Sequence, residues 1–221
     1  MCKGFIDSVY CGSGVDGKGL RVVVFTSGCN LRCKFCHNPE TLYKTGKSVT
    51  AKEIFEQCLR YKAYIRRGGV TISGGEPFVQ KQFCLELIKL LHSADIHCLI
   101  ETNGHVADEE IISACDGFIV DVKNQETDDL SVYDEFLNVC DRLKKSVTLT
   151  NVLIPDVNDA EEKIRRLNEL KSRHASVEKI KFLPFHKMCA EKYEKLGVEF
   201  LSKNDREPSD EDVTRAYDLL K

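Results

Sequence analysis

Six short apolar runs alternate with stretches whose apolar residues recur at helical spacing, and this alternation restricts the possible folds more than any other feature of the sequence. The runs predict strands at Leu20 to Thr26, Val70 to Ser73, Ile96 to Glu101, Gly117 to Val122, Ser146 to Ile154 and Ile180 to Leu183. Strands that alternate with helices are typical of an α/β fold with a parallel sheet. The repetition predicts a partial (β/α)6 TIM-like barrel of parallel strands with outer helices.

Helices are expected between these strands. The helical spacing places them at about Thr50 to Ile65, Lys81 to Ser93, a short helix opened by Ala107 to Glu110, Val132 to Lys144, Asp159 to His174 and Pro208 to Leu220. Neither an internal repeat nor a linker is visible. A chain of 221 residues with 42% hydrophobic residues suits one core. We therefore expect a single domain over 1–221.

Charge and hydropathy exclude several classes of partner. The chain contains 32 Lys and Arg residues and 35 Asp and Glu residues, so its net charge is -3. It therefore lacks the excess of basic residues that is typical of nucleic-acid-binding proteins. The N-terminus lacks the apolar run of a signal peptide, and no later stretch approaches the roughly 20 apolar residues of a membrane span. We expect a cytoplasmic protein that binds neither nucleic acid nor a membrane.

The chain contains 11 cysteines. Structural disulfides are rare in a reducing compartment, so a cysteine cluster there indicates metal binding or chemistry. Eight cysteines are scattered, and we expect them to be small and mostly buried hydrophobic side chains. These are Cys2, Cys11, Cys58, Cys84, Cys98, Cys115, Cys140 and Cys189.

The remaining three, Cys29, Cys33 and Cys36, form one cluster with Cys-x3-Cys-x2-Cys spacing. A structural zinc site requires four ligands, and His37 is too close to Cys36 for one segment to chelate the same ion easily with both. A redox pair would leave the third thiol unexplained. Three thiolates on an iron–sulfur cluster leave one iron open to a ligand that is not protein. An iron–sulfur cluster is therefore favoured, and a zinc-binding adaptor is the non-enzyme alternative.

Polar and glycine-rich residues follow the predicted strands. Because the carboxyl ends of parallel strands meet at one edge, these segments are expected to converge there. They are Ser27 to Cys29, Gly74 to Pro77, Thr102 to Gly104, Asp121 to Lys123, Pro155 to Asp156 and Pro184 to His186.

The cysteine motif, with Phe35 before its last cysteine, resembles the signature of the radical S-adenosylmethionine (SAM) superfamily. The flanking segments resemble the activating enzymes of glycyl radical enzymes, and among these the ones that act on pyruvate formate-lyase. These segments are Gly14 to Arg21, Cys36 to Thr41, Ile72 to Pro77 and Leu183 to His186. The match covers nearly the whole chain.

The resemblance implies an oxygen-sensitive 4Fe-4S cluster on Cys29, Cys33 and Cys36, with SAM chelating the fourth iron. It implies reductive cleavage of SAM and hydrogen abstraction from a glycine of a pyruvate formate-lyase-like partner under anaerobic conditions. A flavodoxin or ferredoxin is the implied electron donor, and we expect a monomer. The alternatives are an activase of anaerobic ribonucleotide reductase and a radical SAM enzyme acting on a small molecule.

The resemblance also assigns SAM contacts. Gly74, Gly75 and Glu76 would hold the methionine amino group, although this sequence is also typical of a tight turn. Lys123 would contact the carboxylate or ribose, whereas taken alone Asp121 and Lys123 indicate a surface ion pair. The other expected cofactor contacts are Phe35, Cys36, His37, Thr102, Asn103, Val122 and His186.

Three of these expectations have alternatives. Phe35, expected beside the adenine, could be a core residue, and His186, expected at the adenine or ribose, could be an ordinary surface histidine. A monovalent cation is a further candidate cofactor, near Asp121, Thr102 and Glu101. Glu101 stands where the family usually has Asp, and this leaves cation coordination open.

Asp16 lies in a glycine-rich loop before the first predicted strand and could be only a turn residue. By resemblance, this loop faces the glycine-containing peptide of the partner, and Asp16 would orient the loop rather than transfer a proton. The chain departs from the family pattern at Lys18, where Pro is usual, and at Thr150 and Asn151, where an Arg often holds the cofactor.

Overall fold

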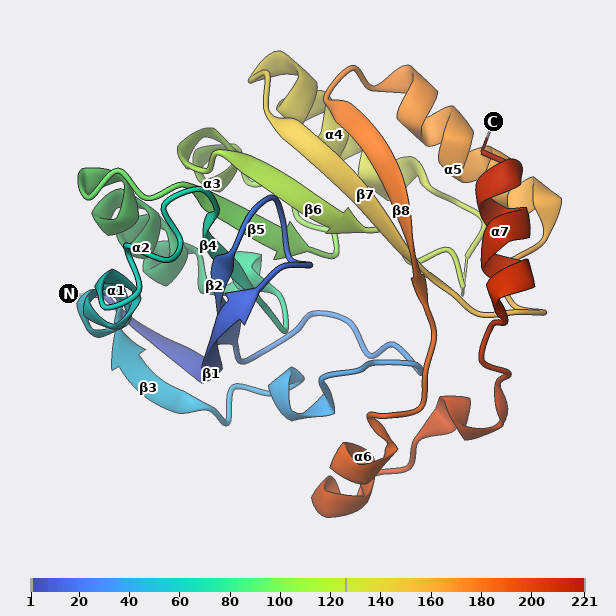
Figure 1. Ribbon diagram of the computed structural model, residues 1–221, viewed down its shortest axis with the longest axis horizontal. Coiled ribbons are helices and arrows are strands. Elements are labelled where there is room, and N and C mark those ends of the chain that lie inside the picture. Colours follow the sequence, from blue (N-terminus) through green and yellow to red (C-terminus); the bar gives the residue numbers. More distant parts are fainter. Residues whose placement is uncertain (1, 126, 221) are drawn as a thin grey trace. The chain divides into compact units, whose positions relative to one another are not determined.

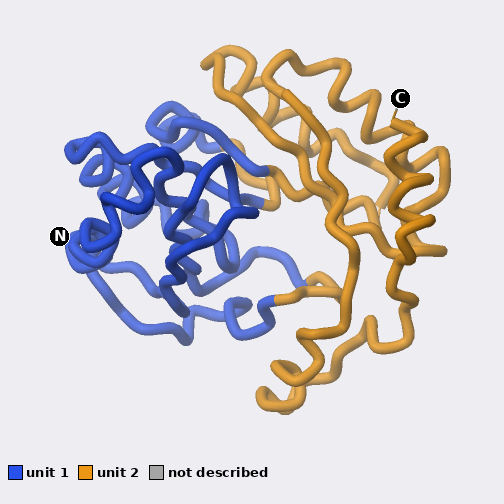
Figure 2. The backbone as a smooth tube through the Cα atoms, in the orientation of Figure 1, with its two compact units in different colours: residues 1–32, 38–102, 108–119 blue, residues 33–37, 103–107, 120–221 orange. Residues whose placement is uncertain are grey.

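The structure is a computed structural model that describes residues 2–125 and 127–220. These residues fall into two compact units (Figure 2). Unit 1 comprises residues 2–32, 38–102 and 108–119. Unit 2 comprises residues 33–37, 103–107, 120–125 and 127–220. The expectation of a single domain over 1–221 stays a prediction.

Unit 1 is built on a sheet with the strand order β3-β1-β2-β4-β5-β6 (Figure 1). β2 pairs in parallel with β4, and β4 pairs in parallel with β5, whereas β1 is antiparallel to both β2 and β3. The parallel strands are nearly continuous runs of buried β-branched residues, as expected of strands covered on both faces. The bounds are β1 Lys3–Ser13, β2 Arg21–Thr26, β3 Lys47–Thr50, β4 Gly69–Gly74, β5 Cys98–Thr102 and β6 Gly117–Asp121.

Three helices and two short 3-10 turns complete unit 1. They are α1 Ala51–Leu59, α2 Lys81–Ser93, α3 Glu109–Ala114, η1 Pro39–Thr41 and η2 Pro77–Gln80. A capping box fixes the start of α1: the Glu53 amide donates to Thr50 Oγ1 at 3.2 Å, and the Thr50 amide donates to Glu53 Oε2 at 2.7 Å. α2 buries Phe83, Leu87 and Leu91 at helical spacing.

Unit 2 contains the end of β6, followed by β7 and β8, which pair in parallel (Figure 1). Its helices present apolar residues at helical spacing to the core, as Ile164, Leu167 and Leu170 do in α5. The bounds are β7 Ser146–Leu153, β8 Val177–Pro184, α4 Ser131–Arg142, α5 Glu161–Arg173, α6 Ala190–Leu196, η3 Leu201–Asn204 and α7 Asp210–Asp218.

All six predicted strands are present within a few residues of their expected bounds, and the α/β fold class is confirmed. The strands β1 and β3 are not among those that the sequence predicts. In β1 the buried Gly4 and Ile6 alternate with the exposed Lys3, Phe5 and Asp7, so this strand lacks the apolar run that identified the others. The helix expected to reach Ile65 ends at Leu59, and residues 60–68 form consecutive turns instead.

Three buried asparagines fasten the end of β6 to β7 within unit 2. Asn151 Nδ2 donates to the Val122 carbonyl oxygen at 2.7 Å. Asn158 Nδ2 donates to Asn124 Oδ1 and to the Val152 carbonyl oxygen, both at 2.9 Å, and Asn158 Oδ1 accepts from the Ile154 amide at 2.8 Å. Buried side-chain networks of this kind rigidify the backbone that they join. Residues 122–124, which include Lys123, are therefore held in place against β7.

Among residues 2–125 and 127–220, no helix has the length and apolar character needed to cross a membrane.

We predict that Asn158→Ala lowers the free energy of unfolding by about 2–4 kcal/mol, because it leaves buried polar partners without their hydrogen bonds. Asn138→Ala is the matched control, since Asn138 is exposed on α4 and its loss should change stability by no more than about 0.5 kcal/mol. Urea unfolding followed by circular dichroism compares the two variants. Equal midpoints would contradict a stabilising role for the asparagine network.

Candidate functional site

In unit 1, the loop before Cys29 is fastened to the end of β4. The Gly75 amide donates to the Thr26 carbonyl oxygen, and the Glu76 amide donates to the Gly28 carbonyl oxygen, both at 2.8 Å. The Gly28 amide in turn donates to the Thr41 carbonyl oxygen at 2.7 Å. The backbone that leads into the cysteine motif is thus fixed by neighbouring backbone.

Gly74 and Gly75 are required for this close approach. Gly74 has φ +107°, a conformation that favours glycine, and a Cβ there would lie 2.3 Å from the Thr26 nitrogen. A Cβ on Gly75 would lie 2.3 Å from the Gly28 carbonyl oxygen. The approach of these glycines to a ligand stays a prediction, and the structure shows that they let two strand-end loops of unit 1 meet.

Glu76 is completely buried, and its side chain has a structural task. Its Oε1 accepts from the Phe78 amide at 3.1 Å, which caps η2, and from Thr102 Oγ1 at 2.8 Å. Glu101, the neighbour of Thr102, accepts at Oε2 from Ser73 Oγ at 2.6 Å. The structure therefore joins Glu76 to Thr102.

Cys29 begins the cysteine motif in unit 1. Its amide donates to the Leu42 carbonyl oxygen at 3.1 Å, and its Sγ lies 3.4 Å from the Leu31 amide nitrogen. The Arg32 guanidinium folds back to the Cys29 carbonyl oxygen at 2.8 Å and lies 4.6 Å from the centroid of the Tyr43 ring. The backbone around this thiol is therefore well anchored.

Cys33 and Cys36 belong to unit 2, where the turn that carries them is anchored on α6. Tyr193 Oη donates to the Cys36 carbonyl oxygen at 2.9 Å, and Lys192 Nζ donates to the His37 carbonyl oxygen at 3.1 Å. Phe35 is only 5% exposed and belongs to an apolar cluster against which Cys33 packs. The other members of the cluster are Val152, Ile154, Phe185, Cys189, Tyr193 and Phe200. Phe35 is thus a core residue, and its contact with adenine stays a prediction.

The three motif thiols differ from most of the scattered ones. Cys29, Cys33 and Cys36 are partly exposed, whereas six of the eight scattered cysteines are buried, as expected, and Cys2 and Cys11 are partly exposed. Burial raises the pKa of the Cys58 thiol to about 12, which keeps it protonated and inert. Accessible soft thiol donors suit an iron–sulfur cluster.

No three His, Cys, Asp or Glu side chains among residues 2–125 and 127–220 are grouped so as to hold a metal ion. The assignment of the three motif cysteines as metal ligands therefore stays a prediction, supported by their spacing and accessibility.

Lys123 is held as a cation beside Asp121 at the end of β6. Its ammonium group is bonded to Asp121 Oδ2, and the two side chains are only 21% and 17% exposed. Burial lowers the pKa of Lys123, but the charges of Asp121 and Cys33 outweigh burial and hold the pKa above its usual value. This is a partly buried pair, not the surface pair that the sequence alone indicated. Lys123 Nζ also lies 5.4 Å from the centroid of the Phe35 ring. A fixed ammonium in this position can bind an anionic group of a ligand.

His37 and His186 lie together in unit 2. Their rings stack with centroids 4.3 Å apart, and His37 Nε2 lies 3.0 Å from the His186 carbonyl oxygen. Burial, followed by the neighbouring His186, lowers the pKa of His37. His186 is exposed. Its exposure agrees with the surface alternative, so its contact with a nucleoside stays a prediction.

The two remaining residues that were expected to contact SAM, Val122 and Asn103, form hydrogen bonds with nearby backbone groups. The Val122 amide donates to the Thr150 carbonyl oxygen at 2.8 Å, within unit 2. Asn103 is buried, and its Oδ1 accepts from the His105 amide at 3.1 Å. Each residue fixes the local conformation after a strand.

The Asp16 loop of unit 1 is hydrogen-bonded to β4 through Thr71 and Arg21, for which the sequence predicted no role. Thr71 Oγ1 donates to the Asp16 carbonyl oxygen at 2.7 Å and accepts from Arg21 Nε at 2.6 Å. Arg21 is only 1% exposed and also donates to the carbonyl oxygens of Gly68 and Val70, at 2.8 and 2.6 Å. The Asp16 carboxylate accepts from Ser13 Oγ. Arg21 was part of the Gly14 to Arg21 motif, but nothing in its spacing indicated Thr71.

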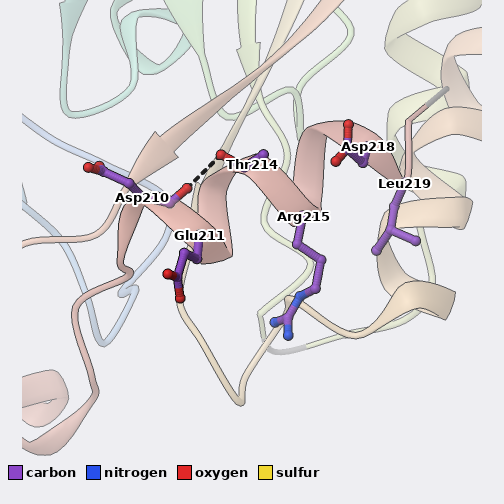
Figure 3. Close-up of a pocket in the computed structure, with 6 residues that line it drawn as sticks. All are labelled: Asp210, Glu211, Thr214, Arg215, Asp218 and Leu219. Atoms are coloured by element: carbon purple, nitrogen blue, oxygen red, sulfur yellow. Dashed lines mark hydrogen bonds between the residues drawn. The ribbon is translucent and has the colours of Figure 1, made fainter.

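The structure brings the predicted residues together in two groups. Unit 1 joins Gly74, Gly75, Glu76 and Thr102 through the contacts above. Unit 2 joins Lys123 to Asp121 and Phe35, and His37 to His186. A separate pocket of unit 2 lies along α7 and is lined by none of these residues (Figure 3). Its lining consists of Asp210, Glu211, Thr214, Arg215, Asp218 and Leu219.

Comparison with known proteins gives consistent results. The family model described as the radical SAM superfamily matches residues 23–167. The pyruvate formate-lyase-activating enzyme of Clostridium pasteurianum is 37% identical over 213 residues, which cover 90% of each chain. The enzyme of the same name from Staphylococcus epidermidis is 34% identical over 98% of this chain and 95% of its own.

A radical SAM methyltransferase from Sphaerobacter thermophilus has a similar structure. The TM-score is 0.63 at 18% sequence identity, and the match covers 90% of this chain and 63% of the methyltransferase. This similarity concerns the fold, and it supports the partial barrel expected from the sequence.

We predict that Gly75→Ala lowers the free energy of unfolding by about 2 kcal/mol or more, because the added Cβ collides with the Gly28 carbonyl oxygen. Gly14→Ala is the matched control, since a Cβ there meets nothing within 4 Å. Chemical denaturation of the two variants measures the difference. Unchanged stability of Gly75→Ala would show that the loop can move aside.

Proposed function

Because the chain belongs to the radical SAM superfamily and, within it, to the pyruvate formate-lyase-activating enzymes, we propose that it installs a glycyl radical on a pyruvate formate-lyase-like partner. The observation that carries this proposal is the 37% identity to such an enzyme over nine-tenths of both chains. The matched region of the family model, residues 23–167, includes all three motif cysteines. The glycyl radical partner is the substrate of the reaction.

We assign Cys29, Cys33 and Cys36 as ligands of a 4Fe-4S cluster, with SAM at the iron that they leave free. When bound, the cluster and SAM supply the reductive chemistry that removes a hydrogen atom from a glycine of the partner. The anchors of the motif support this assignment. Leu42 binds the backbone at Cys29, and Tyr193 binds it at Cys36, so the segments that carry the thiols are ordered by the protein.

The protein's own groups have separate tasks in holding SAM. The Lys123 ammonium, kept charged by Asp121, would bind the carboxylate or ribose. The Gly74–Gly75–Glu76 backbone would hold the methionine amino group, while the Glu76 carboxylate stays bound to Thr102. His186, Phe35 and His37 would border the nucleoside.

Two further expectations are part of the proposal. Asp121 Oδ1 is buried and has no hydrogen-bond partner among the described residues, which supports a monovalent cation beside it. A flavodoxin or ferredoxin would deliver the electron, in the cytoplasm and under anaerobic conditions.

The decisive experiment incubates the reconstituted protein anaerobically with SAM, a reductant and a pyruvate formate-lyase. Electron paramagnetic resonance should then show a glycyl radical on the partner. A signal only on anaerobic ribonucleotide reductase, or SAM cleavage that requires a small molecule instead, would overturn this choice of partner. Colourless, air-stable protein with one zinc per chain would support the zinc-binding adaptor.

Each of Cys29→Ala, Cys33→Ala and Cys36→Ala should reduce reductive SAM cleavage by more than ~100-fold, because a missing thiolate removes a direct ligand of the cluster. Bound iron, measured after anaerobic reconstitution, should fall in parallel. Cys11→Ala is the control, since Cys11 is also partly exposed but lies outside the motif. Normal iron content in any of the three motif variants would refute its assignment as a ligand.

Asp16→Ala should lower activation of the partner about tenfold while SAM cleavage without the partner is unchanged, because Asp16 orients the loop that faces the partner's peptide and does not touch SAM. Thr71→Val should behave alike, since it removes the hydroxyl that binds the Asp16 carbonyl oxygen. Thr71→Ser keeps a hydroxyl and should retain activity. Product analysis with and without the partner separates these effects, and normal partner activation by Asp16→Ala would rule out the role of this loop.

A further inference from the structure

Four basic side chains gather on the turns between α1 and β4 in unit 1. Arg60, Lys62, Arg66 and Arg67 are all exposed, and we call these four residues the basic surface. Tyr64 lies among them with 71% of its surface exposed. The stretch of sequence from residue 57 to residue 75 contains no acidic residue. A chain with a net charge of -3 thus carries a local excess of positive charge here.

In the part of the chain that the structure describes, none of the four side chains forms an ion pair. Paired lysines and arginines are frequent elsewhere, for example Lys52 with Glu56 and Lys81 with Asp108. An ordinary solvated surface intersperses charges of both signs. A patch of one sign instead creates a field that attracts an oppositely charged partner.

The backbone beneath the basic surface is ordered. The Tyr61 amide donates to the Cys58 carbonyl oxygen at 3.0 Å, and the Gly68 amide donates to the Ile65 carbonyl oxygen at 3.0 Å. Ile65 is only 2% exposed and anchors the segment to the core of unit 1. The charged side chains therefore project from a fixed base, which limits the entropy lost when a partner binds.

The basic surface adjoins the Asp16 loop in the same unit. A Cβ on Gly19 would lie 2.6 Å from the Arg67 carbonyl oxygen, and a Cβ on Gly68 would lie 2.0 Å from the Leu20 carbonyl oxygen. The two segments are thus in backbone contact. The loop adds the exposed Lys18 and the apolar Val15, which is 72% exposed.

We propose that the basic surface docks an acidic face of the glycyl radical partner and so aligns that partner with the Asp16 loop. This inference rests on the proposed function, under which the Asp16 loop meets the glycine-containing segment. Backbone contact with that loop favours the partner over the electron donor as the occupant. Complementary charge speeds encounter and sets orientation, and the exposed Tyr64 and Val15 supply apolar contact.

The test uses a variant of the full chain in which all four basic residues become glutamine: Arg60→Gln, Lys62→Gln, Arg66→Gln and Arg67→Gln. A control variant loses the same charge at other sites: Lys89→Gln, Lys144→Gln, Lys171→Gln and Lys179→Gln. Both are assayed with a chemical reductant, so that no protein donor is needed. The substrates are the whole partner and a short peptide with its glycine sequence, too short to reach the basic surface.

We expect the basic-surface variant to raise the KM for the whole partner about tenfold at low ionic strength, because steering by charge contributes factors of this size. Its KM for the peptide should be unchanged, and the control variant should match the unmodified protein on both substrates. Added salt should raise the KM of the unmodified protein more than that of the basic-surface variant.

Other results would overturn the proposal. An unchanged KM for the whole partner would exclude docking, and a loss on the peptide as well would indicate damage to the site. A defect that appears only with flavodoxin as reductant would assign the surface to the electron donor. Binding of single-stranded RNA by the unmodified protein but not by the variant, with normal partner activation, would assign it to nucleic acid. If the unmodified protein activates neither substrate, the proposed function fails as well.

Discussion

The parallel pairing of β2 with β4 is the constraint on which the rest of unit 1 depends. The register places Arg21 opposite Gly69 at one end of the pair and Thr26 opposite Gly74 at the other. Beyond Gly74, the amides of Gly75 and Glu76 extend the pairing into the loop that leads to Cys29. At the opposite end, the buried Arg21 guanidinium binds the carbonyl oxygens of Gly68 and Val70. One strand pair thus positions both the cysteine-bearing loop and the Asp16 loop.

In unit 2, side-chain interactions position the candidate site residues, whereas in unit 1 backbone hydrogen bonds position the loop that leads to Cys29. Asn151 and Asn158 bind the segment after β6, and the ion pair with Asp121 then fixes the ammonium of Lys123. Phe35 anchors its turn by apolar burial, and Tyr193 adds a hydrogen bond to Cys36. Each of these interactions restricts the conformational freedom of the chain when it folds. Less conformational entropy is then lost when a ligand binds.

The sequence predicted those parts of the fold that have a distinct pattern within one short segment. Buried parallel strands are uninterrupted apolar runs, so all six were identifiable, whereas β1 carries Asp7 and Ser8 within an alternating pattern and was missed. The cysteine spacing was likewise visible without the structure.

Contacts between distant residues were not visible in the sequence. The bond from Arg21 to Thr71 joins residues 50 positions apart, and no spacing rule connects them. The inward direction of Glu76 and the core position of Phe35 depend on packing, which a motif does not encode. The resemblance named candidate site residues, and the structure shows which of them, such as Glu76 and Asn103, bind neighbouring backbone amides.

The outermost strands have a consequence for how this chain behaves at high concentration. The strand order of unit 1 ends at β3, which has only four residues and begins with the exposed Lys47. The order of unit 2 ends at β8, which finishes at Pro184 and whose Phe182 amide is bound by Tyr217 Oη at 3.1 Å. Short length, charge, proline and an occupied amide all oppose the addition of a foreign strand. Both outer strands are therefore poor templates for edge-to-edge aggregation.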